Sequence, residues 1–347
     1  MASANNSFVG LAKQTAKGTI QATDNLFKYI MFKNGSIAPN SQFLPSDDGI
    51  GGGALQSDVA KVGVFSAGAF ELIPRPDTLG RFLIGALGKC AAPVIDPPTT
   101  GAGYKHVFTF NTDQYDVPYF TVRSAPGGVW GETFKDMRIS ALGLNWRAAD
   151  YIRGAVQMIG GTPTPSVNMG TWSAADAVDR TPALLAPTTT ISTLEGVALK
   201  VLRGQFVIGN SIPLDEQWIT GSYSPDGFDI VQRQATVAML VKIDSESLYK
   251  KIAYDAAAGA AWTADILKEA DFSLTFASPQ VYDTASPYKM VVKANASALN
   301  PNVAWSVEPI ALQDGRSLTM AITGTFLASS DGEPITVELY NDTAVQY

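Results

Sequence analysis

Alternation of polar and apolar residues recurs along most of the chain. Residues 104–110 alternate and are rich in aromatic side chains, which is typical of a half-buried strand. Residues 137–146 and 151–159 alternate on either side of a short polar turn and predict a hairpin. Further strands are expected at 199–208, 234–243, 272–276, 288–292, 317–326 and 335–340. With glycine and proline between the runs, the pattern predicts an all-β chain with a sandwich or barrel architecture.

Two segments have helical spacing instead. Apolar residues within 77–88 recur on one helix face, with Asp77 expected as the N-cap and Gly88 as the residue that ends the helix. Residues 244–256 show the same kind of spacing after another aspartate. Glycines inside the first segment destabilise an isolated helix, so we expect short flanking helices that are held by packing on a sheet.

The order of these elements repeats along the chain. A strand leads into each expected helix, at 68–73 and at 237–243, and residues 30–37 are similar to residues 206–212 further upstream. We infer a tandem duplication; the alternative is that two β-sandwich halves share this order by chance. The expected organisation is a first domain at 1–165 with an N-terminal arm, a linker at 166–193 and a second domain at 194–347.

A long irregular stretch interrupts the first half. Residues 38–62 contain a glycine-rich centre that follows Asp47 and Asp48, and they are expected to form a loop. Loops of this length inside a compact domain are usually functional or disordered. The counterpart in the second half, residues 213–228, carries Trp218 and Tyr223.

Composition narrows the class of protein. Charged residues make up only 16 % of the 347 residues, well below the usual fraction, so part of the surface is expected to contact other protein. The formal net charge of −7 argues against a protein that grips nucleic-acid phosphates. We recognise no signal peptide and no apolar run long enough to span a membrane, and we expect the chain to be kept in a cytosol until it assembles.

The residues that commonly carry chemistry are scarce. His106 and Cys90 are the single histidine and the single cysteine, too few for a zinc cage or an internal disulfide. A packed or edge position in its strand, rather than a catalytic role, is expected for His106. The triple glycine at 51–53 lacks the Lys-Ser/Thr of a phosphate loop. We therefore expect no enzyme activity, no catalytic or metal-binding residues and no cofactor.

Three segments are similar to a known family. Residues 9–19 (VGLAKQTAKGT), 70–88 (FELIPRPDTLGRFLIGALG) and 203–212 (RGQFVIGNSI) resemble the tail tube, or major tail, proteins of long-tailed bacteriophages. The resemblance implies two tandem tail-tube-like β-sandwich or barrel domains in a structural protein of the virion tail, made in the cytoplasm of a host bacterium. Rings of this family usually hold six such domains, so three two-domain chains would form a trimeric, pseudo-hexameric ring.

The resemblance also implies partners. Rings stack on one another through long loops and terminal arms, and double-stranded DNA passes down the lumen into the host without specific binding. Tape measure, tail terminator and tail tip proteins are the expected partners at the ends, and no membrane partner is expected. An acidic channel surface is expected from the net charge. The residues expected to make assembly contacts are Phe8, Leu11, Phe43, Leu44, Asp47, Asp48, Ile50, Leu55, Trp218 and Tyr223.

Other classes of protein stay open at this point. A non-enzymatic virion-surface or carbohydrate-binding β-sandwich would stack sugars on exposed rings, for which the candidates are Trp130, Trp218, Trp262 and Trp305. A hydrolase would have to work through His106. An outer-membrane porin shares the strand pattern and the acidity, but we recognise no export signal in this sequence.

Overall fold

A computed structural model gives the fold. It describes residues 7–46, 58–96, 103–113, 116–166, 179–191, 193–194, 198–243, 246–254, 268–269, 272–283, 286–294, 303–310, 317–328 and 333–347, and every structural statement below concerns these residues. Almost all regular structure in them is antiparallel β-sheet, which confirms the expected all-β class with short flanking helices.

The larger sheet has 13 strands and is called the long sheet here. Its main path runs β15-β18-β19-β14-β13-β9-β10-β4-β3. The bounds along this path are β15 Lys268–Glu269, β18 Val303–Val307, β19 Thr319–Phe326, β14 Gln232–Lys242, β13 Lys200–Ser211, β9 Gly131–Arg147, β10 Arg153–Gly160, β4 Val59–Leu72 and β3 Phe32–Pro45. Beside this path lie β1 Phe8–Lys13, β2 Lys28–Ile30, β8 Phe120–Ala125 and β11 Pro163–Ser166.

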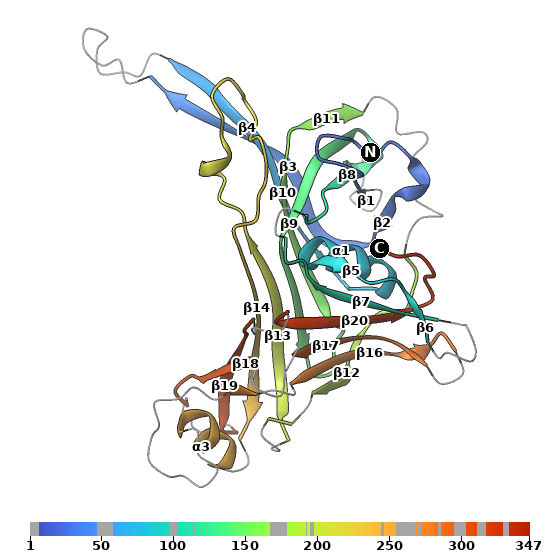
Figure 1. The fold of residues 1–347 in the computed structure, drawn as a ribbon, viewed down its shortest axis with the longest axis vertical. Coiled ribbons are helices and arrows are strands. Elements are labelled where there is room, and N and C mark those ends of the chain that lie inside the picture. Colours follow the sequence, from blue (N-terminus) through green and yellow to red (C-terminus); the bar gives the residue numbers. More distant parts are fainter. Residues whose placement is uncertain are drawn as a thin grey trace.

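A second sheet of seven strands, called the covering sheet here, lies across one face of the long sheet (Figure 1). Its order is β12-β16-β17-β20-β7-β5, with β6 paired to β7. The bounds are β12 Leu185–Ile191, β16 Ser273–Val281, β17 Pro287–Ala294, β20 Ile335–Asn341, β7 Tyr104–Phe110, β5 Gly88–Cys90 and β6 Val94–Ile95. Short 3-10 turns span Asp24–Leu26, Pro126–Gly128 and Asp215–Gln217.

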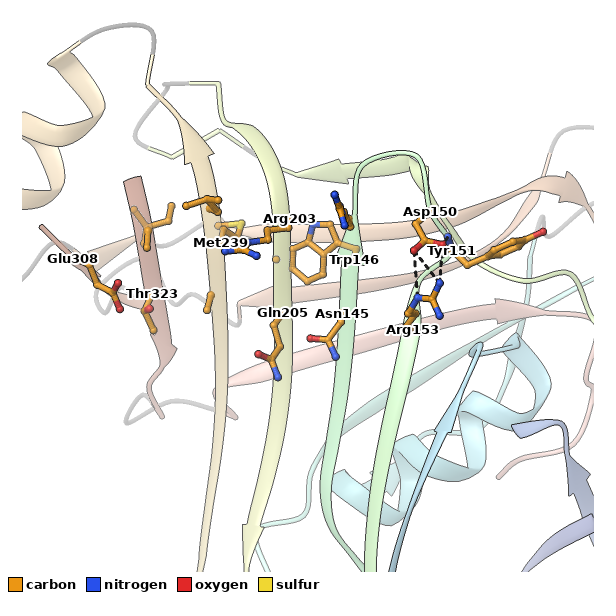
Figure 2. Close-up of a pocket in the computed structure, with 16 residues that line it drawn as sticks. Asn145, Trp146, Asp150, Tyr151, Arg153, Arg203, Gln205, Met239, Glu308 and Thr323 are labelled. Atoms are coloured by element: carbon orange, nitrogen blue, oxygen red, sulfur yellow. Dashed lines mark hydrogen bonds and ion pairs between the residues drawn. The ribbon is translucent and has the colours of Figure 1, made fainter. Parts of the chain in front are cut away.

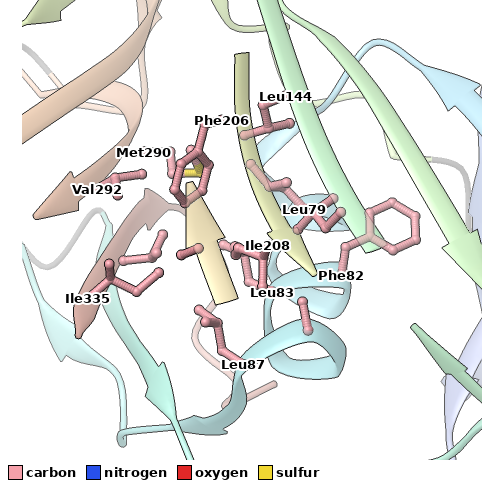
Figure 3. Packing of buried hydrophobic residues seen from close by; sticks show 14 of the residues in the cluster. Leu79, Phe82, Leu83, Leu87, Leu144, Phe206, Ile208, Met290, Val292 and Ile335 are labelled. Carbon is pink, nitrogen blue, oxygen red and sulfur yellow. The ribbon is translucent and has the colours of Figure 1, made fainter. Parts of the chain in front are cut away.

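The main hydrophobic core fills the space between the two sheets. Leu144 and Phe206 point inward from the long sheet toward Met290 and Val292 of the covering sheet (Figure 3). Helix α1, Pro76–Leu87, closes one side of this core with its leucines and Phe82 (Figure 3). The alternation seen in the sequence therefore places one side chain in two in this core.

Helix α1 confirms the helical spacing, with one correction at its start. Arg75 occupies the N-cap position without a side-chain hydrogen bond, and Pro76 fills the first turn, where a missing N–H costs nothing. Asp77 instead binds Lys28, with 2.6 Å between Oδ2 and Nζ. Gly88 ends the helix at φ +91°, a left-handed conformation that favours glycine.

The two halves share one arrangement. Hairpin β3–β4 precedes α1, and hairpin β13–β14 precedes α3, Glu246–Tyr254. Each hairpin has a β-bulge near its helix end, between Phe32 and Asn34 in the first and between Val201 and Arg203 in the second. Strand β10 then pairs with β4, as β19 pairs with β14. The long sheet thus contains β3-β4-β10-β9 and β13-β14-β19-β18, joined where β9 pairs with β13.

The register corrects the sequence match between 30–37 and 206–212. Counting from the bulges, Gly35 corresponds to Gly204 and Ile37 to Phe206, so the similar letters are out of step with the structure. Both sheets take strands from both sides of the expected linker at 166–193, and β12 lies inside it.

Nearly all described residues of the expected loop at 38–62 are in strands. Strand β3 continues to Pro45 and β4 begins at Val59, and the two strands pair along their length as a long hairpin. Its outer part extends away from the body of the molecule (Figure 1), and its side chains are exposed on both faces. A strand without a buried face has no need of polar–apolar alternation, which is why the sequence pattern missed it.

Candidate assembly surface

The two ends of the long sheet are open edges. Among the described residues, β3 pairs only with β4. At the other end β18 pairs with β19, and β15 covers its outer edge only opposite Val303 and Ala304. Unpaired backbone N–H and C=O groups in an edge strand are a template for pairing with another chain.

The joint between the halves shows what such an edge can bind. Strands β9 and β13 pair over seven register positions, from Arg203 opposite Arg147 to Gly209 opposite Ala141. Phe206 lies opposite Leu144, and both side chains are completely buried. Strand β13 occupies in the second half the place that β3 occupies in the first, so this joint fills the kind of edge that β3 leaves open.

The projecting part of the β3–β4 hairpin is called the arm here and comprises residues 40–46 and 58–65. It carries Phe43 and Leu44, each 60 % exposed, together with exposed Val59 and Val62. Exposed apolar side chains grouped on one extension are typical of a protein contact surface. The expected contact residues Asp47, Asp48, Ile50 and Leu55 lie outside the described residues.

The loop between β13 and β14 supports the base of the arm. The indole of Trp218 lies against Gly63, where a side chain on the glycine would collide with the ring. The backbone N–H of Val64 donates to the carbonyl of Tyr223 over 2.7 Å, while the Tyr223 side chain stays 71 % exposed. The structure therefore brings both expected residues to the arm, one as a support and the other on the surface.

The N-terminal strand is part of the body of the molecule. Strand β1 pairs with β2 and β8, and the side chain of Leu11 is fully buried in the main core. Phe8 is half-buried and packs edge-on against Tyr29, with 5.4 Å between ring centroids. Leu11 therefore has no surface to offer as a contact of an N-terminal arm, whereas Phe8 keeps part of its ring accessible.

The face of the long sheet turned away from the covering sheet is called the open face here. Most of its side chains are half-buried or exposed, and the covering sheet and α1 lie on the other side of the long sheet (Figure 1). Its central rows consist of small or neutral residues: Ala69, Ala141, Gly143, Ala155, Gln157, Val207, Gly209, Thr236, Thr325 and Ala304. Among the described residues of these central rows, one is acidic: Glu71, which accepts a hydrogen bond from Asn34 over 2.8 Å.

The comparison with protein families agrees with this geometry. The family model described as phage tail tube protein matches residues 4–287, which is most of the chain. The chain belongs to the phage tail tube protein family. No curated protein matches the chain. The chain is therefore a structural component of a phage tail.

The single histidine of this tail tube protein is a packed residue. His106 is completely buried, with Nε2 at 3.1 Å from Asn341 Oδ1 and 2.9 Å from the Thr343 carbonyl oxygen. Burial lowers the pKa of His106 below its ordinary value, so the ring is held neutral. Cys90 is also buried, and burial raises the pKa of its thiol to about 11. Neither group has the accessibility of a nucleophile or a general base.

Other classes of protein would show exposed tryptophans that could stack on sugars, metal-binding clusters or membrane-spanning helices in the described residues. Trp305 is buried and Trp130 is exposed, while Trp262 lies outside the described residues. Among the described residues there is no cluster of three metal-binding side chains, and no helix is long and apolar enough to cross a membrane.

Sequence reasoning missed one structural device of this tail tube protein. The C-terminal residue, Tyr347, inserts its ring between α1 and His106, where Gly80 leaves room for it. Its hydroxyl accepts a hydrogen bond from Asn341 Nδ2 over 2.7 Å, and Thr343 donates to Asp77 over 3.0 Å. The only signal in the sequence was Gly80 inside a helix, a residue that helices otherwise avoid.

Proposed function

We propose that three chains join head to tail into a closed ring and that rings stack into the tube through which DNA leaves the virion. The joint between β9 and β13 supports this proposal, because the same contact between chains would pair β18 of one chain with β3 of the next. Three chains would supply six repeats of four strands. The two repeats correspond to the proposed domains at 1–165 and 194–347.

The internal joint also supplies a register. Ser306 holds in β18 the place of Ala141 in β9, and Asn40 holds in β3 the place of Gly209 in β13. Because Ala141 is opposite Gly209, Ser306 would lie opposite Asn40 of the next chain. Both side chains are exposed, as partners on the open face should be.

Stacking of rings is the proposed role of the arm. Its exposed Phe43 and Leu44 are apolar surface that a neighbouring ring would cover, and the loop carrying Trp218 fixes its direction. Phe8 and Tyr223, together with Asp47, Asp48, Ile50 and Leu55 from outside the described residues, complete the proposed contacts. Leu11 supports β1 from within the core.

The remaining parts of the proposal follow from assembly. The chain would be made in the cytoplasm of a host bacterium and would end in the virion of a long-tailed phage, without enzyme activity. Tape measure, terminator and tail tip proteins would contact the ends of the tube, and double-stranded DNA would pass through the open lumen without specific binding.

Cross-linking tests ring closure. A chain with Asn40→Cys and Ser306→Cys, in a Cys90→Ala background, should form disulfides between chains under mild oxidation. Directly opposite residues of an antiparallel pair have the Cα separation that a disulfide needs. Non-reducing electrophoresis should show dimers, then covalent trimers and no larger ladder.

The control moves one cysteine out of register. Asn34→Cys with Ser306→Cys should cross-link poorly, since six residues of strand separate position 34 from position 40. A ladder that ends at six chains, or equal yields from both pairs, would refute the three-chain ring or its register respectively.

A second variant tests stacking. Replacing residues 43–62 by Asn-Gly joins Gln42 to Gly63, which are register partners, through a turn suited to a two-residue hairpin. The contacts of Trp218 with Gly63 and of Tyr223 with Val64 are kept. Negative-stain microscopy should show tubes for the natural chain and single rings for the variant; tubes from the variant would refute the role of the arm.

A further inference from the structure

Cationic side chains gather at one end of the open face. Arg147 at the end of β9 lies opposite Arg203 of β13, and Arg153 begins β10 on the other side of β9. All three side chains are exposed. Lys242 follows on β14, two residues beyond Leu240, which is the register partner of Arg203. This arginine cluster (Arg147, Arg153, Arg203 and Lys242) lies at the end of the strands away from the arm.

Carboxylates neutralise only part of the cluster. Asp150 binds Arg153, with 3.0 Å between Oδ2 and Nη2. Glu308 lies on the same row but three strands away from Arg203. Within the described part of the chain, neither Arg147 nor Arg203 has an ion pair. Like charges directly opposite each other destabilise a sheet. The presence of Arg147 opposite Arg203 is therefore not explained by the stability of the fold.

A groove of about 560 Å³ lies at the cluster. Arg203 and Arg153 line it together with the amides of Asn145 and Gln205, which lie side by side on neighbouring strands (Figure 2). Two carboxylates, Asp150 and Glu308, also line the groove. Guanidinium and amide groups are donors suited to phosphate oxygens.

The arginine cluster differs in charge from the rest of the open face. Its central rows are alanine, glycine, threonine, glutamine and valine, with Glu71 near one edge. The acidic lining expected from the net charge of −7 does not describe this face. The face is neutral along most of the strands, and at one end four cationic side chains outnumber the carboxylates of Asp150 and Glu308.

We infer that the arginine cluster contacts phosphates of double-stranded DNA moving past the open face, an inference that rests on the proposed tube. The cluster spans three neighbouring rows at one end of the strands, so each chain of a ring would present it at the same end of the channel. A few phosphate contacts per ring give weak, salt-dependent attraction, which holds the duplex centred and lets it move. An acidic segment of a neighbouring chain, such as Asp47 and Asp48, is the competing occupant.

Tubes assembled from purified chain and a fluorescent 20-base-pair duplex test this assignment. The bound fraction is measured from 20 to 300 mM salt for the natural chain and for Arg147→Gln/Arg203→Gln. Each lost phosphate contact lowers the slope of log K against log salt by about 0.9 for B-form DNA, so the variant should lose about 2 from the slope. Lys89→Gln/Lys105→Gln is the matched control, because both lysines lie on the covering sheet and the charge change is equal.

The outcomes separate the possibilities. A reduced slope in the arginine variant with a natural slope in the lysine control supports the assignment. Equal slopes in all three, or no association of DNA with natural tubes at 20 mM salt, overturn it. Loss of tubes in the arginine variant alone identifies the cluster as a contact between rings and also overturns it. If the natural chain forms no tubes, the proposed function fails, and the same titration on the unassembled chain decides whether the cluster binds DNA.

Discussion

The hairpins β3–β4 and β13–β14 have the same bulge and the same following helix, yet their environments differ. Phe206 and Ile208 of β13 are fully buried, because β9 covers the free edge of that hairpin. On β3, Ile37 is buried while its neighbours along the strand are exposed. The two strands hold corresponding positions in the two halves. The side chains of β13 are more buried because a further strand, β9, pairs with its other edge, whereas the other edge of β3 is open.

The glycine shared by the two hairpins serves a different purpose in each. Gly35 has φ +125° and its hydrogen faces the Ala69 carbonyl, so the backbone itself requires glycine. Gly204 lies beneath the indole of Trp146, so the requirement comes from a side chain. The same residue at corresponding positions is therefore needed for conformation in one hairpin and for packing in the other.

The largest expected difference concerns the inward residues. Phe206→Ala should lower the free energy of unfolding of the unassembled chain by about 3–5 kcal/mol, because it leaves a cavity in a closed core. Ile37→Ala should cost about 2 kcal/mol, since the edge beside it can relax. Urea unfolding measures both; equal losses would show that β3 is already as enclosed as β13.

The glycines give a smaller effect with a sharper signature. Gly35→Ala and Gly204→Ala should each cost about 1–3 kcal/mol, the first through backbone strain and the second through overpacking. Adding Trp146→Leu should recover part of the loss at Gly204 and nothing at Gly35. A double-mutant cycle measures this coupling, and equal coupling at both glycines would contradict the distinction.

The contacts of helix α1 should make the stability of the chain depend on pH. Helix α1 is held by the C-terminal residues that surround His106, where Asp77, Asn341, Thr343 and Tyr347 face the ring. Because the pKa of His106 is lowered in the folded chain, the unfolded chain binds its proton more readily. Stability should therefore fall as the pH drops below 6.5 toward the folded pKa.

Unfolding in urea from pH 7.5 to 5.5 tests this effect against a variant. The chain has a single histidine, so His106→Gln should remove this part of the slope. Burial raises the pKa of Glu333, a carboxyl that acts in the opposite sense, and so the difference between the two proteins is the readout. Identical slopes would mean that the ring does not resist protonation.

Ion pairs of the two helices give the smallest effect. Lys28→Met removes the partner of Asp77 at the largely buried start of α1 and should cost about 1 kcal/mol. Lys250→Met breaks the exposed pair with Glu246, 2.7 Å apart along α3, and should cost about 0.3 kcal/mol. Thermal unfolding at low and high salt measures both, and only the exposed pair should weaken strongly with salt; the reverse order would contradict the difference in burial.

The sequence predicted elements whose side chains meet a core. Strands β9 and β10 and helix α1 were identified because one face of each is apolar and the other is not. The arm was missed because both of its faces meet solvent. Pairing across the halves was also missed, since local periodicity carries no information about which strand lies beside β9.

The same limit applies to the candidate site. Trp218 and Tyr223 were found as aromatic residues in a long loop, and the structure places both at the arm. Leu11 was expected at a contact because it lies near the chain start, but position in the sequence says nothing about burial. Arg147 and Arg203 carried no signal, because only the sheet register makes them neighbours.

Residues 335–347, which are translated late, pack against elements that are translated early. Strand β7 takes β20 as its partner, and α1 receives the ring of Tyr347, although β7 and α1 are translated long before either. A nascent chain that has not yet reached β20 lacks the strand and the ring that complete its first half. The first half is therefore complete only once residues 335–347 have been translated, and a chain that stops before β20 leaves β7 and α1 without these contacts.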